Sequence, residues 1–108
     1  MAHYLIQASY TSGAISDLVK NPQNRADAIR PAIEKAGGRL EAFYHSLGDY
    51  DVVAIVEMPD NAGAAALSMA ISAGGALSSL KTTVLLDMNE SVDAMRKAGG
   101  LGYRPPGA

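Results

Sequence analysis

The segment from Tyr44 to Asp51 gathers polar and aromatic side chains of the types that transfer protons. His45 precedes Asp49 by four residues, and a histidine near a carboxylate can act as a general base, because its pKa lies near neutrality. Adjacent strand residues point to opposite faces, so at most one of Tyr44 and His45 faces a given cavity. The simpler interpretation is that Gly48 and Asp49 form a turn, over which the next aromatic residue packs. The candidates of this group are Tyr44, His45, Asp49, Tyr50 and Asp51.

A second candidate group combines His3, Tyr10, Glu57 and Lys81, which are far apart in the sequence. The strands that hold His3 and Glu57 are expected to be neighbours at the centre of a sheet, so the two side chains could approach each other. Burial would raise the pKa of Glu57 and would let this carboxyl group accept and release protons. Glu57 is therefore a candidate ligand-binding residue, and His3 beside it is a second catalytic candidate. The simpler interpretation is that Glu57, near its strand end, is exposed or pairs with Lys81.

Metal and cofactor sites are not expected. The chain has two histidines, His3 and His45, far apart in sequence and without any cysteine, which does not resemble a metal or haem ligand set. Two Gly-Gly pairs, at residues 37–38 and 74–75, follow predicted helices. They therefore serve as helix caps rather than as a phosphate-binding loop, which would precede a helix.

The chain has 108 residues, of which 48% are hydrophobic and 19% are charged, a composition that is typical of a globular domain. The net charge is −2 and the nine basic residues are scattered, which argues against nucleic acid and anionic membrane surfaces as partners. The absence of cysteine fits the cytoplasm. The first residues do not resemble a secretory leader, and no apolar run approaches the roughly 18 residues of a membrane span.

Strand and helix patterns alternate along the chain. We expect strands over residues 4–10, 39–47, 50–58 and 79–88. In the first, Tyr4, Ile6, Ala8 and Tyr10 share one face. We expect helices over residues 15–19 and 61–73, a helix that begins at Pro22 or Asn24 and ends at residue 36, and a last helix that Asn89 or Ser91 caps and that ends at residue 98. Pro31 should cause a kink or a late start in the helix that ends at residue 36.

The predicted order is β-α-β-β-α-β, a ferredoxin-like α+β fold with a four-stranded antiparallel sheet and helices on one face. The strand over residues 50–58 is apolar without alternation, which is typical of a strand that is covered on both faces. A second copy of the chain, packed sheet on sheet, would cover the helix-free face. We expect a single domain over residues 1–108, with an irregular tail over residues 99–108 that is disordered or lies on a neighbouring subunit.

Residues 47–51, Leu-Gly-Asp-Tyr-Asp, followed by Val-Val-Ala-Ile-Val-Glu, resemble the signature of the GYD domain family. Residues 4–11, 37–44 and 58–61 also resemble that family, so the resemblance covers most of the chain. It implies a ferredoxin-like subunit that pairs into a dimeric α/β barrel, but no established reaction or catalytic residues. The wider barrel superfamily includes monooxygenases, isomerases, haem-handling enzymes and stress proteins, so fold alone does not decide function.

Three functions remain open. The leading hypothesis is a homodimer, or a larger homo-oligomer, that binds a small, largely apolar ligand between sheet and helices, near Tyr10, Tyr44 and Tyr50. The second is a cofactor-free oxygenase or isomerase, with His45 or His3 as proton acceptor and a tyrosine hydroxyl that steadies an oxyanion. The third is a non-catalytic assembly module. A defined pocket of several hundred Å3 favours the first two.

Overall fold

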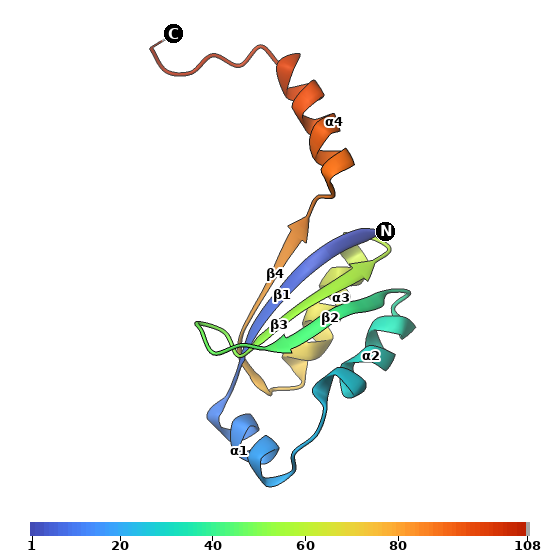
Figure 1. Ribbon diagram of the computed structural model, residues 1–108, viewed down its shortest axis with the longest axis vertical. Helices are drawn as coiled ribbons and strands as arrows, with labels where there is room; N and C mark the ends of the chain where they lie inside the picture. The colour runs from blue at the N-terminus through green and yellow to red at the C-terminus, as the bar shows by residue number, and fades with distance from the viewer. Residues whose placement is uncertain (108) are drawn as a thin grey trace.

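The computed structural model describes residues 1–107 of the chain. Its strands form one open antiparallel sheet in the order β2-β3-β1-β4, and α2 and α3 lie on one face of it (Figure 1). The predicted ferredoxin-like α+β fold is confirmed, with α1 and α4 as additions to the β-α-β-β-α-β order. The elements are β1 (Ala2–Tyr10), α1 (Ser12–Lys20), α2 (Arg25–Lys35), β2 (Arg39–His45), β3 (Val52–Met58), α3 (Asn61–Ala73), β4 (Leu77–Leu85) and α4 (Met88–Gly99).

The core lies between the helices and the two central strands, β1 and β3. Their side chains alternate between faces, and the helix-facing set is buried, including the cross-strand partners Tyr4 and Val56 at 1% exposure each. The opposite set, including Leu5, Val53 and Ile55, is half-buried in the single chain. The unbroken apolar run of β3 therefore supplies two faces, of which the helices cover one.

The edge strand β2 contains an irregularity that the sequence pattern does not indicate. Its register with β3 shifts between Leu40 and Ala42, as in a β-bulge. Leu40 and Phe43 consequently share the helix-covered face, where they line the same cavity. A strand that alternates regularly from Leu40 would instead place Leu40 on the same face as Ala42 and Tyr44. Tyr44 and His45 do lie on opposite faces, as predicted.

The helix starts follow their caps. Asn24 precedes α2, and its side-chain oxygen accepts a hydrogen bond from the Ala26 amide at 2.9 Å. The predicted late start near Pro31 was wrong, because this cap starts the helix at Arg25 and Pro31 lies within it on an exposed position. Water can there satisfy the carbonyl that Pro31 leaves without an amide partner. Asp60 caps α3 in the predicted way, by accepting from the Gly63 amide at 2.8 Å.

The helix α4 lies apart from the rest of the molecule. It continues beyond the end of β4, away from the sheet and from α2 and α3 (Figure 1), and none of its residues is buried. The chain therefore extends over 60 Å, and its radius of gyration is 17.5 Å, against about 13 Å for a compact domain of this length. The predicted irregular tail follows as far as Gly107, whereas Ala108 lies outside the described residues.

Among the described residues, no helix combines the length and the apolar character needed to cross a membrane.

Candidate functional site

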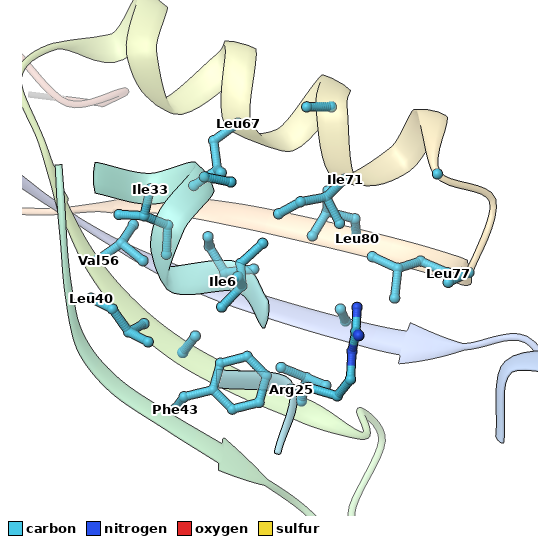
Figure 2. A pocket seen from close by; sticks show the side chains of 18 of the residues that line it. Ile6, Arg25, Ile33, Leu40, Phe43, Val56, Leu67, Ile71, Leu77 and Leu80 are labelled. Carbon is cyan, nitrogen blue, oxygen red and sulfur yellow. The ribbon is translucent and has the colours of Figure 1, made fainter. Parts of the chain in front are cut away.

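A cavity of about 350 Å3 lies between the sheet and the helices α2 and α3. All four strands contribute to its floor, and its walls are almost entirely aliphatic and aromatic (Figure 2). This volume is at the small end of the range of ligand pockets, which is about 300–1,000 Å3. The side chains that define its deepest wall are Ile6, Ile33, Ala54, Val56 and Leu67, and all of them are buried.

Only two of the lining residues, Arg25 and Tyr10, carry a polar side chain. Arg25 is the first residue of α2, and Figure 2 shows its side chain between Phe43 and Leu77, at the edge of the cavity. Tyr10 is the last residue of β1, and its hydroxyl lies 3.3 Å from Nε2 of His45. The cavity thus combines an apolar interior with a polar edge, the usual composition of a small-molecule site.

The charges around Tyr10 act on it in opposite directions. Burial raises the pKa of the Tyr10 hydroxyl, the Arg25 guanidinium lowers it, and the Asp51 carboxylate raises it again. Asp51 also fixes the end of β1, because its Oδ2 accepts a hydrogen bond from the Tyr10 amide at 3.0 Å. The net effect keeps the Tyr10 hydroxyl protonated at neutral pH, as a hydrogen-bond donor at the cavity edge.

The other candidates from the segment between Tyr44 and Asp51 lie outside the cavity. Tyr44 is on the helix-free face and is 67% exposed. Asp49 and Tyr50 belong to the loop between β2 and β3, in which the Ser46 hydroxyl donates to the Tyr50 carbonyl. His45 is exposed and does not line the cavity, and it reaches the cavity only through Tyr10. Of the five predicted ligand-binding residues, Tyr10 alone lines the cavity.

The second candidate group is brought together only in part. His3 and Glu57 are cross-strand partners on the helix-free face, and His3 Nε2 lies 3.6 Å from a Glu57 oxygen. Lys81 instead pairs in register with a residue four positions further along β1, and it forms no ion pair with Glu57. Tyr10 faces the helices, on the opposite side of the sheet. The predicted approach of His3 and Glu57 is therefore confirmed, and the pairing with Lys81 was wrong.

Two further residues join His3 and Glu57 in a charged cluster. Glu41 lies 3.0 Å from His3 Nδ1, and Arg39 contacts both carboxylates, Glu57 at 2.9 Å and Glu41 at 3.4 Å. One donor atom from each of His3, Glu41 and Glu57 lies within 4.8 Å of the other two, so the donor set has the reach to surround a cation. Arg39 already forms ion pairs with both carboxylates, so the cluster is an ion-pair network in this structure.

Removing the Glu57 charge is expected to lower stability in a pH-dependent way. Arg39, by hydrogen bonding, holds the pKa of the Glu57 carboxyl below the ordinary value of 4.5. A lowered folded-state pKa means that the stabilisation is fully present above 4.5 and is lost as the pH falls through the folded value. Glu57→Gln should therefore melt at a lower temperature than the parent protein near neutral pH, and the difference should vanish in acid.

The matched control for this experiment is Glu34→Gln, because Glu34 is exposed and forms no ion pair within residues 1–107. Thermal unfolding followed by circular dichroism checks both variants at several pH values. A Glu57→Gln difference that stays constant between neutral and acidic pH would contradict the ion-pair explanation.

Arg25 is the functional residue that the sequence patterns do not reveal, since it resembles one of several charges on the surface of α2. A weak signal does exist in the spacing. Arg30 has a carboxylate three residues earlier, at Asp27, and the two side chains pair at 3.1 Å. Arg25 has Ala28 and Ile29 three and four residues later, so it lacks a partner on its own helix.

Comparison with known proteins gives one match. The family model described as GYD domain matches residues 4–95 of the chain. The match includes β1 from Tyr4 onward, the other three strands, the helices that line the cavity and the first two thirds of α4. No curated protein matches the chain.

Proposed function

Because this chain belongs to the GYD domain family, we propose that it is a cytoplasmic homodimer whose subunits each bind a small, largely apolar molecule between the sheet and the helices. The observation that carries this proposal is the cavity of about 350 Å3, with its aliphatic and aromatic walls. Buried apolar surface contributes about 25 cal/mol per Å2 removed from water, so a ligand that fills such walls gains most of its affinity there.

Two surfaces support a homodimer as the state in which the protein works. The helix-free face of the sheet presents Leu5, Val53 and Ile55, which a second sheet would bury. The helix α4 presents Val92 and Met95 on one side, where both are exposed within the part of the chain that the structure describes. In a two-fold dimer, each subunit would use the same two surfaces to contact its partner. We therefore propose that a second copy of this chain covers both the helix-free face of the sheet and the apolar side of α4.

An enzymatic role is the second candidate. It is supported by Tyr10, which lines the cavity and whose hydroxyl lies 3.3 Å from His45 Nε2, within reach for proton exchange. Binding is favoured over catalysis, because His45 is exposed and the deep part of the cavity has only apolar walls.

Filling the cavity tests the proposed function. Ala66 and Ala70 lie one turn apart on α3 and are both exposed, but only Ala70 lines the cavity. We expect Ala70→Trp to weaken binding of the neutral dye N-phenylnaphthylamine about tenfold or more, because the indole occupies the ligand volume. Ala66→Trp, the matched control, should bind the dye like the parent protein.

Dye fluorescence during titration measures both affinities, and circular dichroism verifies that both variants are folded. Absence of dye binding by the parent protein would contradict the proposed function. Equal binding by the two tryptophan variants would place the ligand elsewhere.

A further inference from the structure

We propose that the ligand of this cavity is an amphipathic anion, with an apolar body against the sheet and a carboxylate-like head bound by Arg25. This inference rests on the proposed function and adds the chemical class of the ligand. Three observations support it. Arg25 is the one charged side chain among the described lining residues, its guanidinium has unused hydrogen-bond donors, and it lies at the edge of the cavity, opposite the apolar interior.

The cavity has one charged side chain. Among its lining residues within the described part of the chain, Arg25 alone is ionised at neutral pH, and the Tyr10 hydroxyl is the second polar group. A cationic ligand would meet a like charge at the edge of the cavity. A neutral ligand would desolvate the guanidinium without giving it an acceptor of equal strength, which is unfavourable. An anion is the class whose charge complements the site.

The guanidinium of Arg25 has donors to spare. It forms none of the ion pairs among residues 1–107. Its hydrogen-bond acceptors there are both uncharged: the side chain of Gln23, at 2.8 Å, and the Tyr10 hydroxyl. Arg30, Arg39 and Arg96, in contrast, each contact a carboxylate. A guanidinium carries five N–H donors in a planar fork, which matches the two oxygens of a carboxylate.

The geometry also orients the ligand. Arg25 lies at the edge of the cavity beside Phe43 and Leu77 (Figure 2), whereas the buried side chains of Ile33, Val56 and Leu67 form the deep wall. A ligand with an apolar tail and one charged end can place the tail against that wall and the head at the guanidinium. The neighbouring Tyr10 hydroxyl, kept protonated, can donate a second hydrogen bond to the same head.

Three probes of one chain length separate the contributions of head and tail: decanoate, decanol and decylamine. Isothermal titration calorimetry on the full-length protein, below the micelle concentration, gives each affinity. We expect decanoate to bind about tenfold or more tightly than decanol, because hydrogen bonds to charged groups are about twice as strong as neutral ones. Decylamine should bind most weakly of the three.

Arg25→Gln should remove the preference for decanoate, so that decanoate and decanol bind with similar affinity, because the glutamine amide is shorter and carries no charge. Arg25→Lys keeps the charge and should retain part of the preference. Arg30→Gln is the matched control on the same helix, outside the cavity, and should behave like the parent protein. Thermal unfolding verifies that each variant is folded.

Equal affinity of the parent protein for decanoate and decanol would overturn the inference and leave the proposed function intact. A decanoate preference that survives in Arg25→Gln would overturn the role of Arg25. Absence of binding by all three probes would overturn both the inference and the proposed function.

Discussion

Replacing Val92 and Met95 together by serine is expected to convert the proposed dimer to a monomer at micromolar concentration. Both side chains lie on one side of α4, where they are 38% and 63% exposed in the single chain. Full burial of an aliphatic side chain contributes about 1.5–3 kcal/mol, and a two-fold dimer contains each residue twice. Losing four such contributions would raise the dissociation constant more than about a thousandfold.

The shape of the chain is the reason to expect this large effect. A helix without buried residues that lies away from its own sheet gains little tertiary stabilisation from the described part of its chain. Isolated helices of its length, 12 residues, are marginal in water. A contact with a second subunit would supply the missing burial.

Light scattering coupled to size exclusion measures the mass of each variant. The matched control replaces Glu90 and Lys97 by serine, on the polar side of α4. It loses at least as much helix propensity as the test variant, because valine and serine have similar propensities, whereas glutamate and lysine exceed serine. This control should remain a dimer. A monomeric parent protein would contradict the homodimer itself, and a dimeric Val92→Ser, Met95→Ser variant would show that α4 is not the contact.

Replacing Gly38 by alanine is expected to lower the free energy of unfolding by about 1–3 kcal/mol, toward the upper end of that range. A Cβ added at Gly38 would lie well inside van der Waals contact with the Glu57 carbonyl oxygen and the Met58 sulfur, and 3.3 Å from Cγ2 of Ile33. Met58 and Ile33 are at most 1% exposed. The backbone and the core must therefore both move to admit one methyl group.

The helix end explains why a glycine lies so close to the sheet. Gly37 has φ of 86° and follows the last turn of α2. The Gly38 amide donates to the Ile33 carbonyl and the Gly37 amide to the Glu34 carbonyl, both at 2.9 Å, which together form a Schellman motif. This turn brings the chain directly from α2 into β2, the edge strand that carries two cavity-lining residues.

Chemical denaturation of Gly38→Ala measures the predicted loss. Gly48→Ala is the matched control, because an added Cβ there meets no atom within 4 Å and its φ is not positive. The control should differ little from the parent protein. If Gly38→Ala and the parent protein had the same free energy of unfolding, the close approach of the chain after α2 to β3 would not contribute to stability.

Local features of this protein follow from its sequence, because they depend on residues near each other in the chain. Asn24 and Asp60 cap helices through hydrogen bonds that span two or three residues. Gly37 ends α2 because a residue with positive φ is needed there. The alternating faces of β1 follow from strand geometry alone, and they correctly place Tyr10 on the side of the helices.

The site, in contrast, depends on contacts between distant segments. The irregularity after Leu40 arises from the pairing of β2 with β3, and it turns Phe43 toward the cavity. Arg25 faces the cavity because α2 packs beside the sheet with its first residue at the open edge, which the pattern of α2 alone does not indicate. The sequence by itself determined the order of the elements, the caps of α2 and α3 and the family, since these depend on local geometry and on short motifs. Only the tertiary structure decided which polar side chains share a cavity, because that depends on strand register and on how helix and sheet pack.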